Sequence, residues 1–77
     1  MLIQILGPGC ANCERLAENA RAAVARLNLT CEMVKVTDVN AIAEFGVLQT
    51  PALVVNGDVK VVGRVPDIDE IVTLLAS

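Results

Sequence analysis

The chain has 77 residues, of which 55 % are hydrophobic and only one is aromatic, and nine acidic against six basic side chains give a net charge of −3. This composition predicts a single domain over residues 1–77 with an aliphatic core, and it excludes a disordered chain. It also argues against a nucleic-acid interface, because the basic residues are scattered and lack aromatic neighbours, and against a membrane-spanning segment, because no apolar run approaches ~20 residues.

The N-terminal third of the chain predicts a strand followed by a helix. Leu2–Leu6 is apolar on both faces of an extended chain, which suits an interior strand of a covered sheet. After Gly7-Pro8-Gly9, apolar residues recur at three- and four-residue spacing from about Ala11 to Leu27, which indicates an amphipathic helix. Asn28 then suits the left-handed conformation that commonly ends a helix.

The middle of the chain predicts a second strand and a short helix. Thr30–Val36 alternates apolar with charged residues and is typical of a strand. Thr37 or Asp38 can cap a short helix that ends at Gly46. The lone Cys31 in this strand is expected to be a small hydrophobic side chain that faces the core.

The last third predicts a hairpin and a terminal helix. Asn56-Gly57 is a strong two-residue turn signal between a strand over Ala52–Val55 and another over Val59–Val62. Asp67, followed three residues later by Glu70, is a capping-box pattern that opens the helix.

The predicted order is therefore β-α-β-α-β-β-α, an α/β fold in which three helices flank a four-stranded mixed sheet. The strand–helix–strand units imply parallel pairing with right-handed crossovers. The hairpin adds an antiparallel pair, which makes the sheet mixed.

Cys10 and Cys13 stand where the first strand gives way to the first helix. Three residues apart on a helix, they share one face with Cα atoms roughly 5–6 Å apart, within the range of a disulfide. The unpaired N–H groups of the helix N-terminus favour a thiolate at Cys10, although Glu14 opposes part of this effect. We therefore expect Cys10 to be the nucleophile and Cys13 the resolving thiol of a disulfide exchange that needs no cofactor.

The cellular compartment bears on this interpretation. Residues 1–10 lack the positively charged start and the cleavage site of a signal peptide, so a cytoplasmic protein with no membrane partner is expected. In a reducing compartment, a Cys-x-x-Cys pair is more often redox-active or metal-binding than a permanent crosslink.

Two motifs, Cys10-Ala11-Asn12-Cys13 after the first strand and Thr50-Pro51 before the hairpin, together resemble the thioredoxin fold. The stretches GPGCANCERL, TPALVVNG and GRVPDIDEIVTLL are similar, more narrowly, to the small redox-active disulfide proteins, a compact thioredoxin-like and glutaredoxin-like family of bacteria and archaea. The resemblance covers essentially the whole chain. Unlike full-length thioredoxins, the chain has no Asp or Glu obviously placed as a buried acid–base group beneath the cysteines.

The resemblance implies a thiol–disulfide oxidoreductase or electron carrier that acts on protein or small disulfides, with Cys10 matching the nucleophile and Cys13 the resolving cysteine. It implies that the Thr50-Pro51 bond is cis and faces the disulfide, with the backbone of Thr50 pairing with a substrate peptide. A thioredoxin-reductase-like enzyme or a thiol would reset the pair, and a monomer is expected.

Two other functions stay open at this point. The same two thiolates are suited to copper(I), whereas a zinc site prefers four ligands and the chain has no histidine, so no metal site is assigned. Heavy-metal-associated domains also carry Cys-x-x-Cys after their first strand, but their element order is β-α-β-β-α-β. The third possibility is an inactive adaptor that binds proteins.

Overall fold

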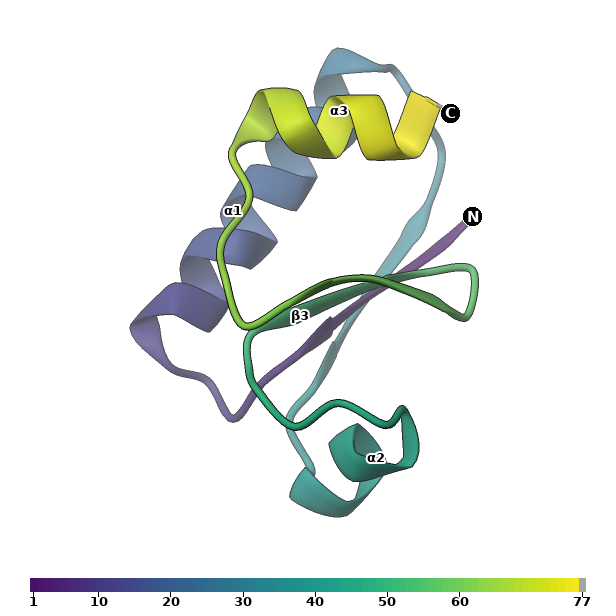
Figure 1. Cartoon of the computed structure of the whole chain (residues 1–77). Helices are drawn as coiled ribbons and strands as arrows, with labels where there is room; N and C mark the ends of the chain where they lie inside the picture. Colours follow the sequence, from purple (N-terminus) through teal and green to yellow (C-terminus); the bar gives the residue numbers. More distant parts are fainter. Residues whose placement is uncertain (77) are drawn as a thin grey trace.

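A four-stranded mixed sheet forms the centre of the fold (Figure 1). The computed structural model describes residues 1–76, so residue 77 of the predicted domain lies outside the described residues. The elements are β1 (Leu2–Leu6), α1 (Ala11–Arg26), β2 (Glu32–Val36), α2 (Val39–Glu44), β3 (Ala52–Val55), β4 (Asp58–Val62) and α3 (Ile68–Ala76). The strand order is β2-β1-β3-β4. The predicted α/β class, element order and mixed sheet are confirmed.

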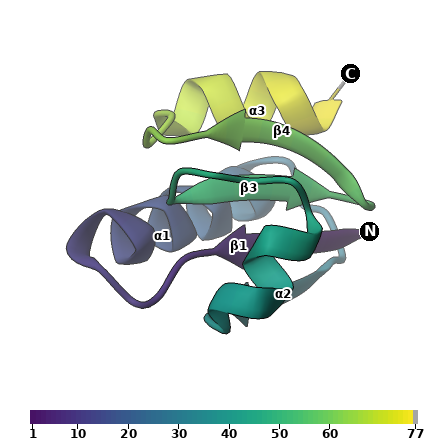
Figure 2. The ribbon, with the colours of Figure 1, turned by 60° about the horizontal axis from the view of Figure 1, so that its bottom comes forward.

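The helices divide between the two faces of the sheet (Figure 2). α1 and α3 cover one face, where Leu16 and Ile71 pack in the larger core with side chains of β1, β3 and β4. α2 covers the other face, where Ile42 packs against Leu6 and Val54. Both central strands therefore bury side chains on both faces, which explains why β3 is apolar throughout and β1 at every position except Gln4.

The direction of β3 corrects one prediction. β1 and β2 pair in parallel through the α1 crossover, but β3 runs antiparallel to β1. Val36 at the end of β2 and Ala52 at the start of β3 both lie opposite Leu6, so the chain enters β3 at the sheet edge where it left β2. Because the chain leaves and re-enters the sheet at the same edge, β3 runs in the direction opposite to β2.

The predicted turns are present. Asn28 after α1 has a φ of 54°, and Asn56 and Gly57 have φ of 51° and 85°, the left-handed pair that a type I′ hairpin needs. Asn56 also binds β1, because its N–H donates to the carbonyl of Leu2 at 2.8 Å and its Oδ1 accepts from the N–H of Leu2 at 2.9 Å. The hairpin is thereby fixed to the N-terminal end of the central strand.

The start of α3 differs in part from the predicted capping box. Asp67 Oδ1 accepts a hydrogen bond from the N–H of Glu70 at 2.8 Å, as predicted. The carboxylate of Glu70, however, accepts hydrogen bonds from Nη1 and Nη2 of Arg64 and does not bond back to the N–H of the cap residue. This hydrogen bonding by Arg64 lowers the pKa of Glu70 and raises the pKa of Arg64.

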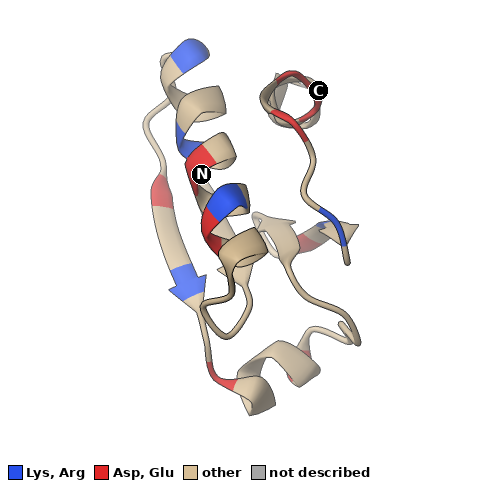
Figure 3. Ribbon diagram, turned by 90° about the vertical axis from the view of Figure 1, so that its left-hand side faces the viewer, with Lys and Arg blue, Asp and Glu red and all other residues tan. Residues whose placement is uncertain are grey.

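Charges of both signs are spread over the surface. Figure 3 shows acidic and basic residues interspersed along α1 and β2. Within residues 1–76, none of the helices has both the length and the hydrophobicity required to cross a membrane.

Candidate functional site

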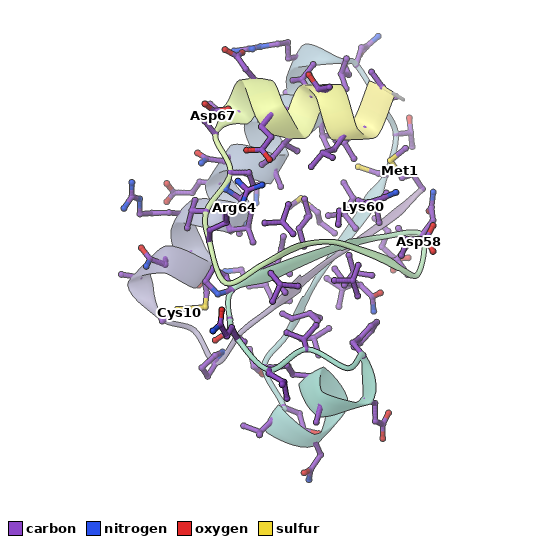
Figure 4. All side chains as sticks on the ribbon, viewed as in Figure 1. Met1, Cys10, Asp58, Lys60, Arg64 and Asp67 are labelled. Carbon is purple, nitrogen blue, oxygen red and sulfur yellow. A yellow bond between two sulfur atoms is a disulfide. The ribbon has the colours of Figure 1, made fainter. Side chains whose placement is uncertain are left out.

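The Cys10–Cys13 disulfide lies at the junction of β1 and α1 (Figure 4). Cys10 is the N-cap residue of α1, in an extended conformation, and its Sγ accepts a hydrogen bond from the N–H of Cys13 at 3.2 Å. The two Cα atoms are 5.0 Å apart, in agreement with the spacing argument. Cys10 is exposed, whereas Cys13 is only 4 % exposed. A substrate therefore has access to the first cysteine.

Gly7 is a site residue that the sequence analysis did not single out. It is buried at the end of β1, where its N–H donates to the carbonyl of Val36 at 2.9 Å. A Cβ added at this position would overlap Sγ of Cys13 and would lie 3.2 Å from Cβ of the same cysteine. The missing side chain thus makes room for the buried cysteine, but the sequence displays this glycine only as part of a Gly-Pro-Gly turn.

The structure brings Thr50 and Pro51 to the same place. The Thr50–Pro51 peptide bond is cis. The Cβ position of an alanine at Gly7 would be 3.8 Å from Cβ of Thr50, so Thr50 and Cys13 flank the same glycine. Pro51 is buried, whereas Thr50 is exposed next to the disulfide.

Gly63, after β4, completes this end of the sheet. Its N–H donates to the carbonyl of Pro51 at 2.8 Å, and its φ is 75°. A Cβ at this position would collide with the side chain of Gln49, with Cβ of Gln49 only 3.2 Å away. Gly63 therefore allows Gln49, in the segment before the proline, to pack closely against the end of β4. No sequence pattern indicated this contact.

An ion pair lies at the first turn of α1, next to Cys13 in the sequence. Lys35 of β2 donates to both carboxylate oxygens of Glu14, in the first turn of α1, at 2.9 Å each. Both side chains are about half exposed. The negative charge expected to oppose the Cys10 thiolate is therefore partly neutralised by the lysine. Within residues 1–76, no charged or polar side chain is buried, so no carboxyl group lies buried beneath the disulfide.

Cys31 lies away from the pair. It is half-buried and packs against the larger core, as predicted. The register of β1 and β2 places it beyond Leu2, whereas Cys10 follows the opposite end of β1. Among the described residues, no group of three or more Cys, Asp or Glu side chains is arranged to hold a metal ion.

Comparison with known proteins agrees with this geometry. The sequence model of the family described as "Thioredoxin domain" matches residues 1–76. The chain belongs to the thioredoxin family. It is 43 % identical over 76 residues to a thioredoxin of Methanothermobacter thermautotrophicus, an alignment that covers 99 % of both chains. It is 41 % identical over 71 residues to a thioredoxin of Methanocaldococcus jannaschii, covering 92 % of this chain and 81 % of the relative.

The predicted resemblance is therefore confirmed. A matched thioredoxin family, two thioredoxin relatives and a disulfide in a Cys-x-x-Cys motif support the same activity. The protein is a thiol–disulfide oxidoreductase.

Proposed function

We propose that Cys10 is the attacking thiol and Cys13 the resolving thiol of the exchange. The observation that carries this assignment is their unequal exposure: Cys10 is exposed at the N-cap of α1, and Cys13 is 4 % exposed behind it. The unpaired N–H groups and the positive end of the helix dipole favour the thiolate form of the exposed sulfur.

The reaction then proceeds in two balanced steps. The Cys10 thiolate attacks one sulfur of a substrate disulfide, which forms a mixed disulfide and releases the other sulfur as a thiolate. The Cys13 thiolate next attacks Sγ of Cys10, which forms the Cys10–Cys13 disulfide and releases the second substrate thiolate. Two electrons have passed from the protein to the substrate, and no cofactor takes part.

We further propose that Thr50 and Pro51 bind the substrate. Thr50 is exposed beside the disulfide, and neither its N–H nor its carbonyl forms a hydrogen bond with another backbone group of residues 1–76. Those two groups are available to an extended substrate segment, as in the addition of a strand. The buried Pro51 fixes the segment that presents them.

The partners follow from the same chemistry. Disulfide-containing proteins are the substrates, and a thioredoxin-reductase-like enzyme or a thiol reductant returns the pair to the dithiol. We place this cycle in the cytoplasm, where a reducing environment keeps the free Cys31 as a thiol. The working unit is a monomer with one domain over residues 1–77.

Three cysteine variants test the assigned roles. Cys10→Ser is expected to abolish reduction of a protein disulfide, because the attacking sulfur is lost. Cys13→Ser is expected to accumulate a mixed disulfide between Cys10 and the substrate, visible by mass spectrometry without reductant. Cys31→Ser is the matched control and keeps both properties. Exchange by Cys10→Ser at the wild-type rate would overturn the proposal.

A further inference from the structure

The outer edge of β2 is a part of the fold that the disulfide chemistry does not use. β2 and β4 are the two edge strands of the sheet, and within residues 1–76 β2 pairs only with β1. Figure 3 shows β2 beside α1, at the margin of the molecule. An open edge of this kind offers a row of unpaired backbone N–H and carbonyl groups to another strand.

The direction of these backbone groups follows from the bonds between β2 and β1. The N–H of Glu32 donates to the carbonyl of Met1 at 2.9 Å, and the carbonyl of Val36 accepts from the N–H of Gly7 at 2.9 Å. Successive residues of a strand direct these groups to opposite edges, so the backbone groups of Met33 and Lys35 point outward. Two residues of β2 are therefore able to pair with an added strand.

The two edges of the sheet differ in regularity. The register of β2 against β1 runs without a shift from Leu2 and Glu32 to Leu6 and Val36. The register between β3 and β4 is interrupted between Leu53 and Val54. An irregularity of that type twists a strand and protects its edge against pairing, so β2 is the edge that is better suited to accept a strand.

A small pocket lies along this edge, between β2 and α1. Its volume is about 220 Å³. The lining residues are Ile5, Ala17, Arg21, Met33, Val34 and Lys35. Pockets that hold whole small-molecule ligands are about 300–1,000 Å³, so this pocket suits one side chain of a larger partner.

The charges at the pocket indicate the kind of partner. Arg21 is exposed and forms no ion pair with a carboxylate of residues 1–76, whereas Lys35 is held by Glu14. Glu32 lies opposite Leu2, and because side chains alternate along a strand it points to the other face of the sheet from Lys35. An uncompensated positive charge beside an apolar pocket favours a carboxylate close to an aliphatic side chain.

We propose that the outer edge of β2 docks an extended acidic segment of a partner protein by strand addition. Backbone hydrogen bonds to Met33 and Lys35 align the segment, and one of its aliphatic side chains enters the pocket. A carboxylate two residues along the segment lies on the same face and meets Arg21. The contact is separate from the chemistry of Cys10 and Cys13 and does not rest on the proposed function.

The test uses a cysteine-free peptide with a central leucine, an aspartate two residues to each side and threonine elsewhere. It is titrated into the oxidised, ¹⁵N-labelled protein and followed by the amide signals. We expect the signals of Arg21, Met33 and Lys35 to shift, and the exchange of the Met33 and Lys35 amides with solvent to slow. A peptide with lysine in place of aspartate should bind more weakly.

Two further peptides test the strand addition itself. Each is N-methylated on alternate residues, one on the odd and one on the even positions. Only one of them should lose binding, because the other carries its methyl groups on the edge that faces away from β2.

A pair of arginine variants tests the role of charge. Arg21→Gln should weaken binding by up to about fivefold, the value of an exposed ion pair. Arg15→Gln is the matched control, because Arg15 is an exposed arginine of α1 outside the pocket, and it should keep the wild-type affinity. Both variants should reduce 2-hydroxyethyl disulfide at the wild-type rate, so the docking edge and the proposed function are tested separately.

Four results would overturn the inference. They are the absence of binding at millimolar peptide, equal affinity for the aspartate and lysine peptides, equal binding of the two N-methylated peptides, and signal shifts confined to the surroundings of Cys10 and Thr50. A protein that sediments as a dimer and protects the Met33 and Lys35 amides without peptide would assign the edge to a second copy of the chain, which also overturns it.

Discussion

At the scale of single residues, the surroundings of the disulfide are set by neighbours that carry no sulfur. Glu14 is four residues after Cys10 on the same helix face, and its N–H donates to the carbonyl of Cys10 at 3.0 Å. Lys35 brings a positive charge to this turn from β2. The charge around the attacking sulfur therefore depends on a contact between two elements.

The ion pair gives a prediction for the reactivity of Cys10. Lys35→Met should raise the pKa of the Cys10 thiol, because an exposed carboxylate is left without its partner. Glu14→Gln should lower that pKa. The measurement is the ultraviolet absorbance of the thiolate in the reduced protein as a function of pH. Lys60→Met, an exposed lysine on β4, is the control, and equal values in all variants would contradict the electrostatic account.

Gly7 gives a second prediction at this scale. Gly7→Ala should destabilise the oxidised protein by about 1–3 kcal/mol, because its Cβ would overlap Sγ of Cys13, which the disulfide holds in place. Urea unfolding of the oxidised protein measures the loss. Gly9→Ala is the control. A Cβ at Gly9 would meet no other atom, but its φ is positive, so any loss of stability in this variant comes from backbone strain alone.

A second pair of variants shows whether Cys13 causes the loss of stability in Gly7→Ala. In Cys13→Ala protein, Gly7→Ala should cost clearly less than in the Cys13 protein, because the sulfur is gone. The same cost in both backgrounds would show that the glycine serves the backbone and not the cysteine.

At the scale of the elements, the segment from β4 to α3 carries ion pairs on its surface. Arg64 binds the carboxylate of Glu70 with two nitrogens, while Asp67 caps the helix. Arg26 of α1 also pairs with Asp69 of α3, which joins the two helices on one face of the sheet. These exposed ion pairs add to the apolar packing of Ile71 and Leu75, which holds α3 on the sheet.

The lowered pKa of Glu70 predicts how this segment responds to acid. A carboxyl group whose pKa is lower in the folded than in the unfolded protein stabilises the fold above its unfolded value of about 4.3, and the contribution is lost as the pH falls through the folded value. Glu70→Gln should therefore be less stable than the wild type at neutral pH, and the difference should vanish in acid. Urea unfolding at a series of pH values measures it.

A control at a second glutamate shows whether the pH dependence comes from the ion pair with Arg64 or from the loss of any negative charge. Glu44 of α2 forms no ion pair within residues 1–76, so Glu44→Gln should leave the pH dependence unchanged. An equal difference between Glu70→Gln and the wild type at neutral and acidic pH would contradict the assigned role of Arg64.

The elements also show what the sequence can predict. The strands, α1 and the hairpin turn follow from short-range signals, such as the apolar run of β1 and the Asn56-Gly57 pair. The direction of β3 does not, because it depends on the edge of the sheet to which residues 37–51 return the chain. Glu70 looks like half of a capping box, but its partner is decided by Arg64, which packs beside it only after folding.

At the scale of the whole molecule, the fold collects three separate segments at one end of the sheet. The Cys10–Cys13 turn, the Thr50–Pro51 segment and Gly63 lie together because Leu6 pairs with Ala52 and Ala52 pairs with Val62. The motifs that carry sulfur and proline were visible in the sequence. The roles of the two glycines that let them approach, Gly7 and Gly63, were not, since they depend on long-range packing.

The central claim is that Cys10 and Cys13 form one reversible dithiol–disulfide couple. The most direct test is a redox titration of the purified, metal-free protein in dithiol/disulfide buffers, read by alkylation and mass spectrometry. We expect both cysteines to change together as a two-electron couple between about −300 and about −120 mV, with Cys31 unchanged throughout. If no intramolecular disulfide forms anywhere in that range, the account is contradicted.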